Sequence, residues 1–458
     1  MVDYSPPPYK IKMVEPISLI SRNEREKALQ RASYNLFNLK ADEIYLDFLT
    51  DSGTGAMSHT QWASMMVGDE SYANARSFTR FKEVVQEFTG LPEVIPTHQG
   101  RAAENVLFGY LLKDKPGSWV VSNQSFDTTV GHILYNGAKP VDILNEDGKD
   151  PTKNLPFKGD MDVDQLKKIL GETPEKVAII TLVLTNNAGG GQPVSMTNVK
   201  EVAKIARDHG KLFALDIARV VENAYFIQQR DENYKDKTLR EIVREICTNA
   251  DIVWMSAKKD AYVNIGGFIA LKDETLANRL KERLILFEGF PTYGGLAGRD
   301  LEAIATGLQE AVEGQTVAHR VQQVAYLIER LHEEGIPVVL PPGGHAAFID
   351  AKALLPHIPP EQFPAQALAC ALYLEGGIRG VEIGSLMFGR EEAGQFVPAP
   401  MELVRLAIPR RVYTKAHFDY VVDVCKRLKN MGEEIKGMKI IEEPELLRHF
   451  TCKLAPLD

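Results

Sequence analysis

Two adjacent lysines, Lys258 and Lys259, end the apolar run "DIVWMSA". A lysine with an ordinary pKa of about 10.4 is a poor nucleophile at neutral pH. A neighbouring cation and partial removal of water both favour the neutral amine. The pair is therefore suited to one lysine that reacts with a carbonyl group and one that activates it. The alternative is that both lysines are simply solvated where a strand leaves the core.

A second candidate group is Asp216, which ends the apolar run "LFALD", with Arg219 three residues later. A buried carboxylate needs a partner, and an Asp-Arg ion pair that steadies a loop is the simplest interpretation. The functional interpretation is that Asp216 keeps a heterocyclic nitrogen protonated while Arg219 contacts a nearby phenolic oxygen. Pyridoxal phosphate presents both groups. Asp216 and Lys259 lie at the ends of two predicted strands, and ligands bind at strand ends in open α/β sheets.

A phosphate site is predicted in "PTHQGRAAENVLFGYL", where Gln99, Gly100 and Arg101 enter a helix. Free amides at a helix N-terminus bind phosphate, and glycine allows close approach. The same residues could form an ordinary turn. The run "NNAGGGQPVS" lacks the GxGxxG spacing of a dinucleotide site, and the sequence has neither HExxH nor GxSxG. Dehydrogenase, zincin and serine hydrolase are therefore disfavoured.

The elements that must position these residues are apolar runs between residues 100 and 275. Such runs without polar alternation predict strands buried on both faces, hence a mainly parallel sheet covered by helices. The run 194–211 predicts a crossover helix with a serine or threonine cap that ends at Gly210. The predicted strands are "SWVVSN", "KPVDIL", "KVAIITLVLT", "KLFALDIA", "DIVWMSA" and "GFIALK".

The pattern changes after residue 310. One long helix over residues 310–335 is followed by the shorter strand candidates "IPVVL", "GHAAFID" and "ELVRLAIP". This pattern predicts a second, smaller α+β domain. We expect an N-terminal arm over residues 1–19, a large domain over 58–311 and a small domain from 20–57 and 312–458.

Composition limits the class of protein. The 458 residues carry 53 basic and 62 acidic side chains, a net charge of -9, which disfavours nucleic acid as a partner. No apolar stretch is long enough to span a membrane, and no secretory signal is evident at the N-terminus. The four cysteines include no CxxC pair, which favours reduced thiols in a cytoplasmic protein.

Many segments of the chain, in order, resemble the β-eliminating lyases of the aspartate-aminotransferase fold. The segments that carry the resemblance include "LTDSGTGAMS", "GDESYA", "THQGR", "ARVVENAYFI", "SAKKD", "NIGGF", "EGFPTYGGLAGRD", "FPAQALA", "IPRRVYT" and "LRHFT". The resemblance implies pyridoxal phosphate, a fold type I large domain with a smaller α+β domain, a monovalent cation, preferably potassium, and a homotetramer.

The resemblance also implies a role for each matched residue. Lys259 would bind the cofactor covalently, with Lys258 as its cationic neighbour. Phe126 would stack on the cofactor ring, Asp216 would hold the ring nitrogen and Arg219 would lie near the phenolic oxygen. The phosphate would be surrounded by Gln99, Gly100, Arg101 and Ser256.

Other matched residues would bind the amino-acid substrate and the cation. Thr50, Asn187 and Arg405 would bind the substrate carboxylate or orient the bound substrate, for which a bidentate arginine is suited. Tyr72, reaching in from a neighbouring subunit, would be the acid at the leaving carbon. Glu70 and the carbonyls of Gly53 and Asn264 would supply oxygen ligands to potassium.

Within this family, one branch releases indole from tryptophan and another releases phenol from tyrosine. The phenol branch has arginine and methionine in the segment where this chain has Val381 and Ile383, and an apolar wall suits indole. Asp127 and His449 stand where that branch has threonine and phenylalanine. We therefore predict tryptophan cleavage to indole, pyruvate and ammonia. The alternatives are tyrosine cleavage, elimination from S-alkyl cysteine or serine, and a silent binding protein.

Overall fold

The computed structural model describes residues 6–392, 394–445 and 447–457. The chain forms two compact units. Unit 1 comprises Met1–Asp51, Lys149–Asn154 and His319–Asp458, and unit 2 comprises Ser52–Gly148 and Leu155–Ala318. Residues 6–20, within the predicted N-terminal arm and just past it, contain neither helix nor strand.

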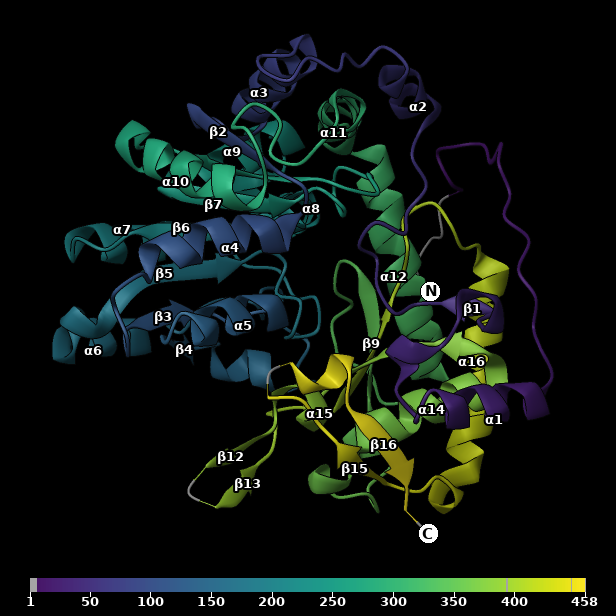
Figure 1. Ribbon diagram of the computed structural model, residues 1–458. Coiled ribbons are helices and arrows are strands. Elements are labelled where there is room, and N and C mark those ends of the chain that lie inside the picture. Colours follow the sequence, from purple (N-terminus) through teal and green to yellow (C-terminus); the bar gives the residue numbers. More distant parts are fainter. Residues whose placement is uncertain (1–5, 393, 446, 458) are drawn as a thin grey trace. The chain divides into compact units, whose positions relative to one another are not determined.

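Unit 2 is built on a sheet with strand order β2-β8-β7-β6-β5-β3-β4 (Figure 1). Strands β7, β6, β5, β3 and β4 run parallel, whereas β8 is antiparallel to both β7 and β2. The predictions of a mainly parallel sheet and of six of its strands are confirmed. The bounds are β2 Glu93–Thr97, β3 Trp119–Ser122, β4 Lys139–Asp142, β5 Val177–Val183, β6 Phe213–Asp216, β7 Ile252–Ser256 and β8 Gly267–Leu271.

Helices cover this sheet, and Figure 1 shows α4 and α5 in front of it. The predicted crossover helix is α7, where the Ser195 hydroxyl accepts the backbone N–H of Asn198 and Gly210 follows the helix with a φ of 62°. The helices of unit 2 are α2 His59–Met65, α3 Arg76–Thr89, α4 Gly100–Leu111, α5 Asp127–Tyr135, α6 Val163–Glu172, α7 Met196–Asp208, α8 Val220–Arg230, α9 Leu239–Asn249, α10 Glu274–Phe287 and α11 Gly298–Ala311.

The prediction of one helix over residues 310–335 is wrong. Helix α11 ends at Ala311, and α12 (Gln315–Glu333) begins after a turn. Gly314 in this turn has a φ of 90°, in the left-handed region that favours glycine. The apolar spacing on both sides of the turn hid this break in the sequence.

Unit 1 contains a small sheet of order β11-β14-β9, with β14 antiparallel to both neighbours. Strands β9 and β14 were predicted, but "IPVVL" is not a strand, because only Val338 forms a bridge, to Ile349. The elements of unit 1 are α1 Arg22–Arg31, β1 Leu46–Asp47, most of α12, β9 Ala346–Asp350, α13 Ala351–Leu354, α14 Pro364–Gly376, β10 Ile378–Arg379, β11 Val381–Ile383, α15 Ser385–Phe388, β12 Arg390–Glu392, β13 Gln395–Val397, β14 Leu403–Ala407, α16 Lys415–Met431, β15 Met438–Glu442 and β16 Lys453–Pro456.

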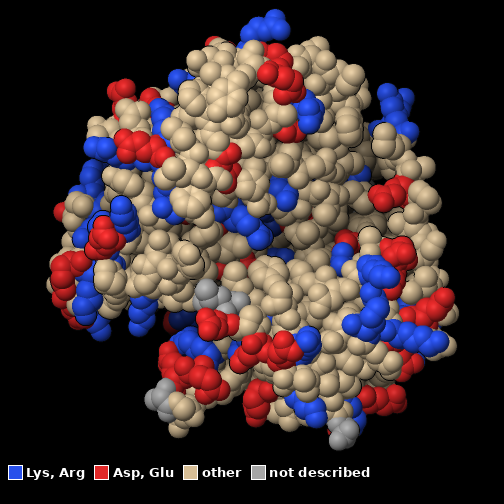
Figure 2. Space-filling model, viewed as in Figure 1, with Lys and Arg blue, Asp and Glu red and all other residues tan. Residues whose placement is uncertain are grey.

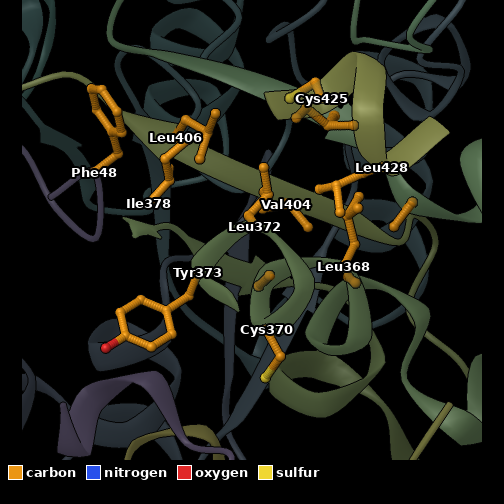
Figure 3. Close-up of a cluster of buried hydrophobic side chains, with 14 of the residues drawn as sticks. Phe48, Leu368, Cys370, Leu372, Tyr373, Ile378, Val404, Leu406, Cys425 and Leu428 are labelled. Atoms are coloured by element: carbon orange, nitrogen blue, oxygen red, sulfur yellow. The ribbon is translucent and has the colours of Figure 1, made fainter. Parts of the chain in front are cut away.

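The core of unit 1 brings together α14, α16 and β14. Figure 3 shows Leu368 and Leu372 of α14 near Val404 of β14, with Cys425 and Leu428 of α16 close by. Removal of these side chains from water is the main force that holds the three elements together.

On the face drawn in Figure 2, basic and acidic side chains are intermixed towards the left and the lower right, with broad uncharged areas elsewhere. Among the described residues, no helix is both long and apolar enough to cross a membrane. The cysteines Cys247, Cys370, Cys425 and Cys452 are free thiols and all are buried.

Candidate active site

The carboxyl edge of the unit 2 sheet gathers most of the predicted cofactor residues. Because β3, β5, β6 and β7 are parallel neighbours, the residues that follow them meet at one edge. Asp216 is the last residue of β6 and Ser256 is the last residue of β7. Asn187, buried in the loop after β5, belongs to the same edge.

The N-terminus of α4 adjoins the end of β7. Gln99 is the N-cap residue and forms no side-chain capping bond, so the first N–H groups of the helix are available to a ligand. A Cβ added to Gly100 would lie 2.6 Å from Cβ of Ser256, which shows how closely helix and strand approach. The Ser256 hydroxyl and these amides form a site that fits a phosphate group. Arg101 lies at the same helix start and acts electrostatically on Lys258.

The two lysines after β7 have different surroundings. Burial lowers the pKa of Lys258, and the charge of Arg101 lowers it further. The Lys258 carbonyl accepts the N–H of Gly53 at 2.8 Å, and a Cβ on that glycine would lie 2.6 Å from Cε of Lys258. Lys259 instead acts electrostatically on Asp216. The lysine predicted to bind the cofactor is thus the one that faces the predicted aspartate.

Asp216 occupies an environment that favours a positively charged ligand. Burial raises the pKa of this carboxyl group, while the N–H of Ala218 at 3.0 Å, Lys259 and Arg219 oppose the rise. Arg219 is buried and caps α8. A protonated ring nitrogen would supply the missing stabilisation of the carboxylate. The donor set fits pyridoxal phosphate, because it offers an amine, a carboxylate, an arginine and a phosphate site.

Helix α5 begins beside this group of residues. Phe126 is its N-cap residue, and the buried Asp127 carboxylate accepts the N–H of Thr128 at 2.6 Å. Phe126 lies at the start of the helix that follows β3. This position is suitable for stacking on a ligand bound at the carboxyl edge of the sheet.

Sequence reasoning missed Glu104, a carboxylic acid of α4 that is 3% exposed. Its Oε1 accepts the Thr129 hydroxyl at 2.6 Å, whereas Oε2 has no hydrogen-bond partner among the described residues. Burial raises the pKa of Glu104 to about 7, and the charges of Asp216 and Asp127 contribute to the rise. The available signal was a glutamate two residues before the apolar run "VLFGYLL" and three residues after Arg101.

Three other buried polar atoms at this edge have no hydrogen-bond partner within the described ranges. They are Oε1 of Gln124, Oγ1 of Thr185 and Nδ2 of Asn186. Gln124 follows β3 and the other two follow β5. Buried polar groups are normally paired, so these atoms indicate that a polar ligand or water completes the site.

The residues predicted for the leaving group and the cation are arranged less compactly. Tyr72 is 71% exposed and packs against Phe290 and Tyr293, with ring centroids 5.7 and 5.4 Å away. The Asn264 side-chain amide donates to the Gly53 carbonyl at 3.0 Å, which brings these two residues together. The Glu70 carboxylate accepts the N–H of Gly298 and pairs with Arg299.

Five predicted substrate residues belong to unit 1. Arg405 of β14 pairs in register with Val381 of β11 and donates to the Leu49 carbonyl at 3.1 Å. Thr50 directly follows Leu49 in the chain. Val381, Ile383 and His449 are buried, and Val381 and His449 line the same small pocket.

Replacing Gly100 by alanine is expected to weaken cofactor binding. The added methyl group would meet Ser256, and overpacking of this kind costs about 1–3 kcal/mol. The Kd for pyridoxal phosphate should therefore rise by about 10- to 100-fold, measured by absorbance titration. Gly171→Ala is the matched control, because nothing lies within 4 Å of its Cβ position in α6. Equal Kd values for the two variants would contradict a phosphate site at Gly100.

Known proteins resemble this chain over most of its length. Residues 47–424 match the family model described as "Beta-eliminating lyase". A tryptophanase of Salinibacter ruber is 53% identical, with 98% of this chain and 95% of the relative covered. A tyrosine phenol-lyase of Pasteurella multocida is 48% identical, with all of both chains covered. A Thermus thermophilus aspartate aminotransferase superposes with a TM-score of 0.60 at 15% identity over 91% of this chain and 97% of that one, which shows the same fold.

Proposed function

The chain belongs to the β-eliminating lyase family, and from this premise we propose that it cleaves L-tryptophan to indole, pyruvate and ammonia. It is a pyridoxal-phosphate-dependent lyase of fold type I. The observation that carries the substrate assignment is the 53% identity with a tryptophanase over nearly the full length of both chains. The leaving-group residues of this chain support the same choice.

The cofactor is held by residues at the carboxyl edge of unit 2. Lys259 would hold it covalently, Asp216 and Arg219 would bind its ring nitrogen and phenolic oxygen, and Phe126 would stack on the ring. Its phosphate would be held by Gln99, Gly100, Arg101 and Ser256. When bound, pyridoxal phosphate supplies an electron sink for the substrate α-carbon.

The side chains of this protein move the protons and orient the substrate. The Lys259 amine would remove the substrate α-proton, and the charge of Lys258 would favour the neutral form of that amine. Arg405 binds the substrate carboxylate as a bidentate fork, with Thr50 and Asn187 orienting the substrate.

Departure of indole requires an acid, because carbon is a poor leaving group until indole C3 is protonated. We assign that proton to the phenol of Tyr72, whose exposure in the single chain suits a residue that completes the site of a neighbouring subunit. Asp127 and His449 orient the indole nitrogen and stabilise the positive charge that develops there. Val381 and Ile383 supply the apolar wall.

Three further features are part of the proposal. The carbonyls of Gly53 and Asn264 and the carboxylate of Glu70 would hold potassium, since all three offer the oxygen ligands that a hard cation prefers. The active protein is a homotetramer, which accounts for the exposed Tyr72. A cytoplasmic location fits four free, buried cysteines.

Product analysis with L-tryptophan and L-tyrosine side by side tests the substrate. The holoenzyme with potassium should form equal amounts of indole and pyruvate from tryptophan. Efficient release of phenol from tyrosine with negligible indole from tryptophan would refute the proposal and favour the phenol-releasing activity.

Replacing His449 by phenylalanine should impair indole release selectively. This buried imidazole is expected to interact with the leaving group, so kcat/KM for tryptophan should fall by about 10- to 100-fold. Elimination from S-methyl-L-cysteine needs no protonation of carbon and should change by less than about threefold. The exposed His332, changed to phenylalanine, is the control. Equal losses of kcat/KM with both substrates would show that His449 does not act on the leaving group.

A further inference from the structure

Two glutamates of unit 1 face one another across Gly384. Glu382 lies in β11 and Glu402 directly precedes β14, and each is 2% exposed. A Cβ on Gly384 would lie 2.4 Å from Oε2 of Glu402 and 2.8 Å from Oε1 of Glu382. Two charged carboxylates so close together and removed from water would repel each other strongly.

Both glutamates bind the start of the short helix α15. The Glu382 carboxylate accepts the N–H groups of Leu386 and Met387 at 2.9 and 3.1 Å. The Glu402 carboxylate accepts the N–H of Ser385 at 3.2 Å and also its hydroxyl. The pair therefore fixes the position of this turn.

The same turn is bound from its other side by Arg448. The guanidinium group donates to the carbonyls of Ser385 and Leu386, each at 2.7 Å, and of Gly389 at 2.8 Å. Arg448 begins the 3₁₀ helix η8 (Arg448–Phe450), and the next residue is His449. A continuous set of hydrogen bonds thus connects the two glutamates to the residue before His449.

Glu382 and His449 also line the same pocket, together with Val381. Val381 and Ile383 flank Glu382 in β11 and point away from it, as alternate residues of a strand do. The residues proposed to face the leaving group are therefore held by the strand and the turn that the glutamates fix.

Electrostatics favour a single proton on the pair near neutral pH. Burial and the charge of Glu402 together raise the pKa of Glu382 to about 8, although the N–H groups of Leu386 and Met387 and the charge of Arg448 oppose the rise. Burial likewise raises the pKa of Glu402 to about 6. The other titratable or charged groups that face the pair or its partners are Asp350, Lys352, Glu443, His449 and Cys452.

We propose that Glu382 and Glu402 are positioning residues that share one proton across Gly384 and, through α15 and Arg448, hold His449 against the leaving group. This inference rests on the proposed function, because it assigns His449 to the leaving group. Loss of the shared proton places two negative charges across Gly384, loosens α15 and displaces His449. Elimination with a carbon leaving group should then become selectively slower.

The test compares kcat/KM for L-tryptophan and S-methyl-L-cysteine in the holoenzyme between about pH 6 and 9. In the unsubstituted protein, the ratio of kcat/KM for L-tryptophan to kcat/KM for S-methyl-L-cysteine should fall by about tenfold as pH rises through about 8. In Glu382→Gln, which keeps the shape without an ionisable proton, the ratio should stay within about twofold. Glu443→Gln is the matched control, because it removes an exposed carboxylate that pairs with Arg448. In this variant the ratio should still fall as pH rises.

Thermal unfolding of the same variants provides an independent readout. Because the folded-state pKa of Glu382 is raised from 4.5 to about 8, its contribution to stability is full below pH 4.5 and is lost as pH rises through about 8. Glu382→Gln should flatten this fall in Tm. If it does not fold, Glu402→Gln replaces it.

The outcomes distinguish failure of the inference about the glutamate pair from failure of the proposed function. If Glu382→Gln flattens the pH dependence of Tm but the ratio of kcat/KM values still falls with pH, the two glutamates only stabilise the fold, and the positioning role is overturned. If Glu382→Gln changes neither pH dependence, the shared proton itself is overturned. Absence of indole at every pH would refute the proposed function alone, and the ratio would then be measured with L-tyrosine, whose leaving group is also carbon.

Discussion

Replacing Lys259 by alanine is expected to lower kcat for tryptophan by about 10⁴-fold, the largest effect of any single change in the protein. The variant loses both the amine that binds the cofactor and the base that removes the α-proton. Exchange of the substrate α-proton in deuterated water, followed by NMR, should also be lost. Absorbance of the covalently bound cofactor near the visible edge should disappear, although the phosphate site still binds free cofactor.

Lys258→Ala is the matched comparison, since the two lysines are adjacent and both partly buried. This variant should keep the cofactor covalently bound and should turn over more slowly, because Lys258 interacts electrostatically with Arg101, whereas Lys259 interacts with Asp216. The reverse pattern, with covalent binding lost in Lys258→Ala and kept in Lys259→Ala, would mean that the roles have been exchanged.

Replacing Asp216 by asparagine should lower kcat by about 10²–10³-fold, comparable to the removal of one charge-stabilising group from other active sites. Asparagine keeps the shape of the side chain but cannot hold a ring nitrogen in its protonated state. The pH dependence of the cofactor absorbance should change as well, because the charge beside the ring is gone. Steady-state kinetics and absorbance titration of the purified variant measure both effects.

Asp251 offers a control at the opposite edge of the same sheet. Its carboxylate accepts the N–H of Phe213 at 3.0 Å, where β6 begins. Asp251→Asn removes a carboxylate from the same pair of strands and should leave kcat within about threefold. Comparable losses in the two variants would attribute the Asp216 effect to folding and not to the cofactor.

The central sheet was predictable because its strands are buried on both faces. The run that forms β7 is apolar from Ile252 to Met255, and all five residues of Ile252–Ser256 are buried. Asp216 and Lys259 could be placed together from sequence because Asp216 ends one such strand and Lys259 lies just past the end of the next. The order of strands, with β8 antiparallel between β2 and β7, was not encoded in any local pattern.

Unit 1 was harder to predict because its strands are short and pair over long distances. Strand β1 has two residues and pairs with β10, more than 300 positions away. Glu382 and Glu402 are separated by twenty residues and become neighbours only through the pairing of β11 with β14. Glu104 escaped notice for a similar reason, since its relation to Asp216 depends on how α4 packs on the sheet.

The most direct test locates the covalently bound cofactor. The holoenzyme is reduced with borohydride, digested and mapped by mass spectrometry. The account predicts that the added mass lies on Lys259, in the peptide that follows β7. Modification of Lys258, or of a lysine outside this segment, would contradict it.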